Sequence, residues 1–364
     1  MSSEPNQHNE RSTNTLSGRK LALISLLTLL AAIFIALFWG ETANLFGLRR
    51  FFSSARSAGT LSAPTSIAVA TAMDSSVSGE KLQSTMKTPV YFLSHGGPNV
   101  MYEVEHPAYR KLAQIGREIT TKVKPRAVVV FSAHWQAGRD TIQVNTAEKT
   151  DLIYEYSSFY GFPNHYYKEQ YPNVGSKEVA QKVLDLLKDA GIAAEGVKRG
   201  LDHGVWASFK CAFEPDTNPL NVPVVQVSLF DSEDPDQHYR LGQAVARLRE
   251  ENILIIVSGM AVHNLRDLRF TFDSKRPLPY AVSFDEALKD AVTTAPSGRQ
   301  KAMAELLKRG DARQAHPSFE HLLPIHIGAG AAGEDLGKRT WTLPEGSMSW
   351  AQYRFGEIGN SSSL

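Results

Sequence analysis

The chain of 364 residues has very little cysteine, since Cys211 is the only one. A single thiol excludes an intrachain disulfide framework and any zinc cluster built from cysteines. The chain also has no excess of charge of one sign, because 39 basic residues and 38 acidic residues leave a net charge of +1. Such a chain has no strong basic field to hold a polyphosphate backbone, and nucleic acid is not expected as a partner.

Several catalytic signatures are also absent. The sequence contains no glycine-rich phosphate loop and no GxSxG nucleophile elbow. Its Asp and Glu residues do not cluster in a pattern typical of a paired-carboxylate site. What the chain does have is apolar material, 42% of its residues, together with 11 histidines. This is enough for a sizeable core, so wholesale disorder is excluded.

The N-terminal residues differ in character from the rest of the chain. Residues 1–20 are polar and predict a disordered tail, whereas residues 21–39 form an uncharged apolar run. At 1.5 Å per residue this run would span roughly 28 Å, close to the thickness of a hydrocarbon core. We therefore predict a transmembrane helix at 21–39 and a single-pass membrane protein. A buried core helix and a cleaved signal peptide fit the run less well.

Residues 40–85 are rich in Ser, Ala and Thr and predict a linker or a targeting segment. Within them, RRFFSSARS (49–57) has a composition typical of a mitochondrial presequence, although it lies internally. Met86 directly precedes the first predicted strand, so translation from there would give a cytoplasmic protein. Basic residues flank both ends of the apolar run, and the membrane orientation stays open. We place the catalytic domain at residues 86–361.

From Thr88 onward, short apolar runs alternate with amphipathic stretches. The apolar runs predict strands at 90–93, 127–131, 222–229 and 253–257. The amphipathic stretches predict helices at 109–123, 177–190, 239–250 and 284–294. This alternation indicates an α/β domain, a sandwich in which helices cover both faces of a central, mainly parallel or mixed sheet.

Three of the predicted strands lead into a histidine: VYFLSH ends in His95, VVVFSAH in His134, and ILIIVSGMAVH in His263. In open α/β sheets, ligands bind beyond the carboxyl ends of the strands, so the three imidazoles are expected to converge. Their spacing matches no short zinc-finger pattern, and a lone histidine after a strand is more often structural. Together they favour one metal ion held by imidazoles.

A fourth histidine, His203, lies in GLDHGVWASF between two glycines. It is a candidate general acid–base or a further metal ligand. The spacing alone is equally consistent with a loop histidine that bonds to backbone. The nearby aromatic segment YGFP (160–163) is a candidate wall for a planar substrate, although aromatic loops more often serve packing.

Several short motifs follow one another along the domain: SHGGP (94–98), SAHW (132–135), FYGFP (159–163), GLDHGVW (200–206), SG with VHNLR (258–266), AHPSFEHLLP (315–324), GAG with AAG (328–333) and YRFG (353–356). With these motifs in this order, residues 89–356 resemble the class III extradiol ring-cleavage dioxygenases of the 4,5-DOPA dioxygenase extradiol type, within the LigB-like superfamily.

The resemblance implies a sandwich around a mixed sheet and an enzyme that opens catechol rings with O₂. It implies metal ligation by His95, His134 and His263. It places His203 at the family's fourth histidine, which acts as acid–base or approaches the metal itself. The residues that it suggests as substrate contacts are Tyr160, Phe162, Trp206 and His321.

The identity of the metal stays open at this stage. Oxygenases with a mononuclear Fe(II) centre typically use two histidines and a carboxylate, yet the matched motifs offer no carboxylate ligand. An all-histidine site also suits zinc, and the family includes zinc-binding and iron-dependent members. We expect one divalent metal per chain, Zn²⁺ or Fe²⁺. Two alternatives to the dioxygenase are a zinc hydrolase using the same histidines and a non-catalytic, membrane-tethered binding domain. The sequence does not indicate an oligomeric state.

Overall fold

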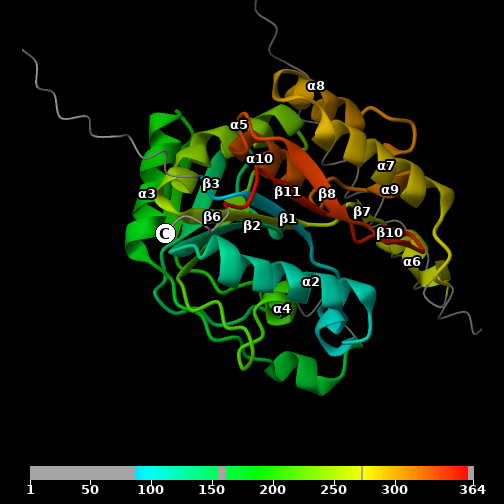
Figure 1. Ribbon diagram of the computed structural model, residues 1–364, viewed down its shortest axis with the longest axis horizontal. Coiled ribbons are helices and arrows are strands. Elements are labelled where there is room, and N and C mark those ends of the chain that lie inside the picture. The colour runs from blue at the N-terminus through cyan, green and yellow to red at the C-terminus, as the bar shows by residue number, and fades with distance from the viewer. Residues whose placement is uncertain (1–86, 155–160, 272–273, 360–364) are drawn as a thin grey trace, which may run out of the picture. The chain divides into compact units, whose positions relative to one another are not determined.

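An eight-stranded sheet runs through the centre of the computed structural model (Figure 1). The structure describes residues 87–154, 161–271 and 274–359. The strands lie in the order β4-β3-β5-β2-β6-β1-β11-β8. Their bounds are β1 Val90–Ser94, β2 Ala127–Gln136, β3 Thr141–Asn145, β4 Ala193–Val197, β5 Val224–Leu229, β6 Ile253–Gly259, β8 Gly337–Trp341 and β11 Gln352–Phe355.

The sheet is mixed. Its central strands β5, β2, β6 and β1 are parallel to one another, whereas β3 pairs with β5, β11 with β1, and β8 with β11 in antiparallel fashion. At the edge, β4 is parallel to β3. A second, small sheet has the order β7-β10-β9, with β7 at Val262–His263, β9 at Pro344–Glu345 and β10 at Met348–Ser349. The predicted α/β fold is confirmed in its mixed-sheet form.

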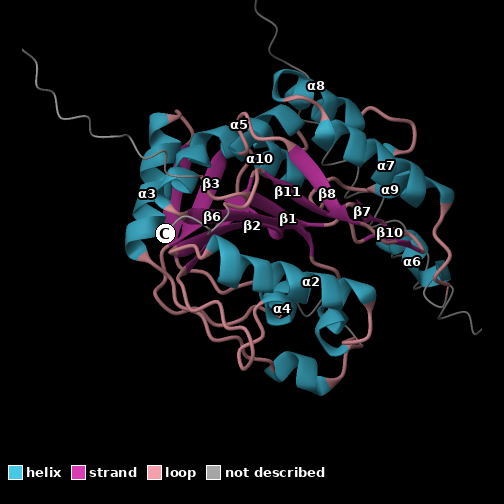
Figure 2. Cartoon of the chain, viewed as in Figure 1, coloured by secondary structure: helices cyan, strands magenta, loops and turns pink. Residues whose placement is uncertain are grey.

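Helices cover both faces of the central sheet (Figure 2). One face carries α2 (Pro107–Glu118) and α4 (His203–Ala212). The other carries α3 (Lys177–Asp189), α5 (Pro235–Val245), α7 (Pro279–Thr293), α8 (Pro296–Leu306) and α10 (Leu323–Ala331). Strand side chains alternate between the two cores as the pleat requires: Phe92 packs with the α5 and α10 layer, and Leu93 packs with the α2 and α4 layer.

Short elements connect these layers. They are the helices α6 (Leu265–Thr271) and α9 (Ala312–Ala315), the 3₁₀ helices Pro98–Tyr102, Asn164–Lys168 and Ala246–Glu251, and a π-helical turn at Ile119–Val123. The predicted helix at 177–190 matches α3, where Ser176 caps the first turn by accepting from the Val179 N–H. The predicted helix at 239–250 begins earlier, at Pro235. The reason is that the Asp234 carboxylate accepts from the N–H groups of Asp236 and Gln237.

The register of β1, β6 and β2 fixes where the site forms. Leu93 and Ser132 are both paired with Ser258 of β6, so the three strands end at one edge of the sheet. His95 follows β1 directly, and His134 lies near the carboxyl end of β2. The predicted convergence of strand ends therefore holds for these two histidines.

The prediction of a single-pass membrane protein is corrected by the structure. Within 87–154, 161–271 and 274–359, it has no helix with the length and apolar character needed to cross a bilayer. The longest helix of these ranges, α7, has 15 residues, whereas a spanning helix needs about 20. The tail at 1–20, the apolar run at 21–39 and the linker at 40–85 lie outside the described residues, and the predicted domain boundaries stay predictions.

Candidate active site and metal centre

Three imidazoles meet beyond the carboxyl edge of the sheet. The Nε2 atom of His134 lies 3.2 Å from Nε2 of His95 and 3.2 Å from Nε2 of His321. His95 and His321 are buried, and His134 is half-buried. His321 comes from the turn just before α10 rather than from a strand. The structure thus groups two of the predicted metal ligands with a histidine that the sequence suggested as a substrate contact.

The spacing of these nitrogens suits a metal ion. Imidazole nitrogens bound to one metal at 2.0–2.1 Å in tetrahedral geometry stand about 3.3 Å apart. Burial and the neighbouring imidazoles lower the pKa values of His95 and His134 well below their usual range. The rings are therefore neutral, which is the form that ligates metals. Each of the three residues offers a ligand atom within 4.8 Å of the other two.

The opposite ring nitrogens of two of these histidines have protein partners. His95 Nδ1 lies 2.9 Å from Ser258 Oγ, and His321 Nδ1 lies 2.9 Å from a carboxylate oxygen of Glu320. Burial alone would raise the pKa of the Glu320 carboxyl, but its hydrogen bond and charge interaction with His321, together with further hydrogen bonds, lower the pKa to about 2. An ionised Glu320 accepts the Nδ1 proton of His321 and so leaves Nε2 free for a metal.

His263, the third predicted ligand, lies directly beside this cluster. It belongs to β7, where it pairs with Met348 of β10, and its ring stacks on that of His321. His263, Glu320 and His321 form a second group of potential ligands whose atoms lie within 4.8 Å of one another. Burial and the adjacent His321 lower the pKa of His263 well below its usual range. The structure brings all three predicted histidines into one neighbourhood, with His321 joining the two groups.

His203 occupies the first position of α4 and is buried. Its ring centroid lies 3.9 Å from that of His134 and 6.0 Å from that of His95. It is therefore a close neighbour of the candidate ligands, outside both groups that could hold a metal. This position suits proton exchange with a molecule bound at the cluster.

A buried carboxylate fixes the segment that carries His203. Asp202 is fully buried and accepts hydrogen bonds from Ser132 Oγ at 2.7 Å, from Arg199 at 2.9 Å and from the Gln226 amide. Ser132 Oγ in turn accepts from the backbone N–H of His134. A buried charge is tolerated when it is paired and fully hydrogen-bonded, as here. The network joins the end of β2 to the start of α4.

Glycine is required where α4 starts. A Cβ at Gly204 would lie 2.7 Å from Ser132 Oγ and 2.8 Å from Cδ2 of His134. Such distances are too short for a real carbon contact, so the missing side chain lets His134 pack against the helix.

The aromatic residues suggested as substrate contacts have different positions. Trp206 is fully buried among the residues of the α2 and α4 layer, and its indole N–H donates to the carbonyl of Ile153. Phe162 is half-buried, with its ring centroid 5.0 Å from that of Tyr166. Tyr160 lies outside the described residues. Their roles toward a substrate stay predictions.

Sequence reasoning missed the contribution of Glu320. The matched motifs offered no carboxylate ligand, yet this carboxylate reaches the ring of His321. The only signal was the adjacency of Glu320 and His321 in FEHLLP, and adjacent residues do not share a face of a helix.

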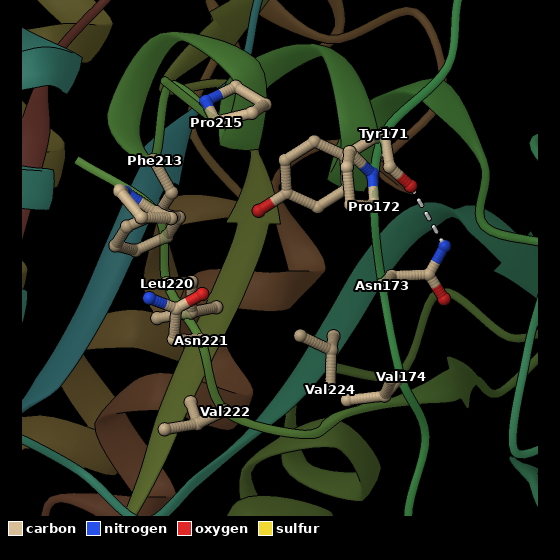
Figure 3. A pocket seen from close by; sticks show the side chains of 11 residues that line it. Tyr171, Pro172, Asn173, Val174, Phe213, Pro215, Leu220, Asn221, Val222 and Val224 are labelled. Atoms are coloured by element: carbon tan, nitrogen blue, oxygen red, sulfur yellow. Dashed lines mark hydrogen bonds between the residues drawn. The ribbon is translucent and has the colours of Figure 1, made fainter. Parts of the chain in front are cut away.

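A separate pocket of about 340 Å³ lies at the other end of the strands (Figure 3). Tyr171, Phe213 and Leu220 are among its walls, together with Val224, the first residue of β5. Because β5 runs parallel to β2, this pocket lies near the amino ends of the strands, whereas the histidines lie at the carboxyl ends. None of the predicted site residues lines it.

Comparison with known proteins identifies the family to which the chain belongs. A family model described as the catalytic LigB subunit of aromatic ring-opening dioxygenase matches residues 88–356. The chain therefore belongs to the LigB family of aromatic ring-opening dioxygenases. The family resemblance seen in the motifs, and with it the expected extradiol ring-opening enzyme, is confirmed.

Particular relatives cover the same part of the chain. It is 35% identical over 271 residues to a 4,5-DOPA dioxygenase extradiol of Beta vulgaris, with 73% of this chain and 95% of that protein aligned. It is 32% identical over 278 residues to a protein of the same description from Escherichia coli K12, with 76% and 97% aligned. The crystal structure of an uncharacterized protein from Escherichia coli K12 has a TM-score of 0.60 at 28% identity and covers 74% of this chain and 100% of that chain.

Proposed function

We propose that the chain opens the ring of a catechol beside its diol with O₂, at a divalent metal held by His95, His134 and His321, with His263 completing the set. The observation that carries this assignment is the meeting of three Nε2 atoms, with His134 3.2 Å from each of the other two. In the tautomers that carry their protons on Nδ1, neutral imidazoles at this spacing turn unshared electron pairs toward one another, an arrangement that a shared cation stabilises.

When bound, the metal supplies polarisation of the diol oxygens and electron exchange with O₂. Ring opening by O₂ needs a metal that changes redox state, which Fe²⁺ does and Zn²⁺ does not. We therefore assign Fe²⁺ as the active metal and regard Zn²⁺ as an ion that the same histidines also bind. The relatives described as 4,5-DOPA dioxygenases support, as the substrate, a catechol whose ring carries a side chain.

His203 is the residue assigned to proton transfer. Its ring stands 3.9 Å, centroid to centroid, from His134, so it borders the position of the diol. It takes a proton from a catechol hydroxyl on binding and returns it as the ring opens. The Asp202 network holds the start of α4, and thus His203, in place. Burial of the surrounding histidines keeps bulk water from the reacting atoms.

The test uses the full chain, loaded with Fe²⁺ under anaerobic conditions and then mixed with a 4-substituted catechol and air. We expect one O₂ consumed per catechol and the appearance of a ring-opened yellow chromophore. A His203→Gln variant should bind the same amount of iron but turn over roughly 10²–10⁴ times more slowly. The proposal fails if the iron-loaded chain consumes no O₂, or if the His203 variant reacts at the original rate.

The zinc hydrolase and the non-catalytic binding domain expected as alternatives receive no support from the family membership. A sample that contains zinc and no iron distinguishes a zinc-dependent reaction from the iron-dependent dioxygenase reaction. Catechol turnover that follows zinc content, with no iron present, would contradict the redox assignment.

A further inference from the structure

Ser258 lies between the candidate metal ligands and the helix that carries His203. It belongs to β6, is fully buried, and is paired with Leu93 of β1 and with Ser132 of β2. Its hydroxyl makes two contacts: one with His95 Nδ1 at 2.9 Å and one with the carbonyl oxygen of Gly204 at 2.5 Å. One side chain thus touches both a candidate ligand and the residue next to His203.

The donor and acceptor roles in this chain of contacts follow from counting protons. A serine hydroxyl has one proton, and a carbonyl oxygen can only accept. The Ser258 proton therefore points to Gly204, and its oxygen accepts from His95. This requires a proton on Nδ1 of His95. A neutral imidazole has a single N–H, so Nε2 of His95 keeps its electron pair, and this atom faces His134 at 3.2 Å.

We propose that Ser258 is a positioning residue for the metal centre, one that fixes His95 in the tautomer able to bind metal and ties its ring to the start of α4. This inference rests on the proposed function, because it assigns His95 as a ligand. The bond to Gly204 holds the ligand and the acid–base residue His203 in one relative position. A metal ligand whose second nitrogen is held in this way binds metal more tightly.

Ser132, which is paired with Ser258 in the register of β2 and β6, makes similar hydrogen bonds but differs in the group from which it accepts. Its hydroxyl also donates to the start of α4, to the Asp202 carboxylate, and it also accepts from a candidate ligand. That acceptance comes from the backbone N–H of His134, however, and leaves the choice of tautomer untouched. The Ser258 hydroxyl, in contrast, contacts an imidazole nitrogen, Nδ1 of His95.

The chain offers a matched control in Ser208. It is buried within α4, and its hydroxyl donates to the same Gly204 carbonyl and to that of Val205, both at 3.1 Å. Ser208→Ala removes a buried hydroxyl and a bond to Gly204 without touching His95. Ser258→Ala likewise removes a buried hydroxyl and a bond to Gly204, but it also removes the acceptor for Nδ1 of His95. The His95 ring is then free to turn or to place its proton on Nε2.

The experiment measures the dissociation constant for Zn²⁺ of the metal-free full chain, by competition with a chromophoric chelator. We expect Ser258→Ala to bind Zn²⁺ roughly 10–100 times more weakly, and Ser208→Ala to bind it as the unaltered chain does. Circular dichroism of the metal-free proteins establishes that both variants are folded. Ser258→Thr keeps the hydroxyl, so its affinity should return toward that of the unaltered chain, which also provides a test if the alanine variant does not fold.

Equal Zn²⁺ affinity in Ser258→Ala and Ser208→Ala would overturn the inference, as would a threonine variant as weak as the alanine variant. These results would leave the proposed function intact, because the unaltered chain would still bind metal and open the ring. If the unaltered chain binds neither Zn²⁺ nor Fe²⁺, the proposed function fails, and the role of Ser258 fails with it.

Discussion

The imidazole rings of His263 and His321 stack face to face, with their centroids 3.6 Å apart and their planes 14° apart. His263 reaches this position from the short strand β7, and His321 reaches it from the turn before α10. Because His321 also meets His134, the stack connects His263 to the other imidazoles. His321 is therefore the residue shared by both groups of potential ligands.

This sharing predicts unequal effects of two alanine substitutions. His321→Ala removes a nitrogen from both groups and should weaken Fe²⁺ binding by more than the roughly 10–100-fold that loss of an outer partner costs. His263→Ala should weaken it less. Metal content after dialysis against a graded chelator series measures both, with the exposed His165→Ala as control. Full iron retention by His321→Ala would contradict the ligand assignment.

Glu320 should control metal affinity through the ring of His321. Glu320→Ala removes the acceptor 2.9 Å from Nδ1, and we expect a roughly 10–100-fold loss of affinity. Glu320→Gln keeps an oxygen acceptor without the charge, so its metal affinity should lie between that of Glu320→Ala and that of the unaltered chain. Isothermal titration with Zn²⁺ gives the comparison. The exposed Glu305→Ala should match the unaltered chain, and an equally small effect at Glu320 would show that its carboxylate does not support His321.

A side chain at Gly204 should disturb both stability and the site. The added Cβ of Gly204→Ala would press on Ser132 and on the ring of His134, and overpacking of this kind costs about 1–3 kcal/mol. At Gly310 a Cβ meets nothing within 4 Å, so Gly310→Ala is the matched control. Urea unfolding compares the two. Gly204→Ala with the same midpoint as Gly310→Ala would show that the close packing at α4 has no energetic consequence.

Acid should destabilise the fold through three core histidines that are not among the candidate metal ligands. Burial lowers the pKa values of His238, His316 and His326 from 6.5 to about 4. Between pH 6.5 and pH 4 the unfolded chain binds protons that the folded chain does not, so stability falls as the pH falls through this window. Each histidine contributes full stability above pH 6.5 and loses up to about 1.4 kcal/mol per pH unit below it.

Urea midpoints at pH 7.5, 6 and 5 measure this effect on the metal-free chain. We expect the midpoint to decrease steadily, and the decrease to be smaller in His326→Gln, which lacks one of the titrating groups. A midpoint that stays constant from pH 7.5 to pH 5 would mean that these rings are not held neutral by burial.

Local sequence signals were sufficient for the central strands and for the convergence of two histidines, His95 and His134. β1, β2 and β6 are continuous apolar runs because both faces of the sheet are covered, so their existence could be predicted, as could the positions of His95 after β1 and His134 near the end of β2. β8 and β11 could not be predicted, because GKRTW and QYRF are short, largely polar segments that pair antiparallel with strands distant in the sequence. Their pairing depends on contacts distant in sequence, which short patterns do not encode.

His321 shows the same limit within the site. No strand precedes it, and its motif contains prolines that argue against a regular helix, so nothing local placed it beside His134. The packing of α10 against β6 brings it there, together with Glu320. Family motifs pointed to His321 as a substrate contact, whereas its position beside His95 and His134 depends on the tertiary fold.

Ring opening should depend on one metal ion per chain at the histidine cluster. To test this dependence, Fe²⁺ is titrated anaerobically into the chelator-treated full chain, and catechol-dependent O₂ uptake is measured at each addition. We predict that O₂ uptake is absent without iron, rises in proportion to the iron added and reaches a plateau at one Fe²⁺ per chain, and that His134→Ala shows no such rise. Undiminished O₂ uptake in the iron-free protein, or a normal titration in His134→Ala, would contradict this dependence.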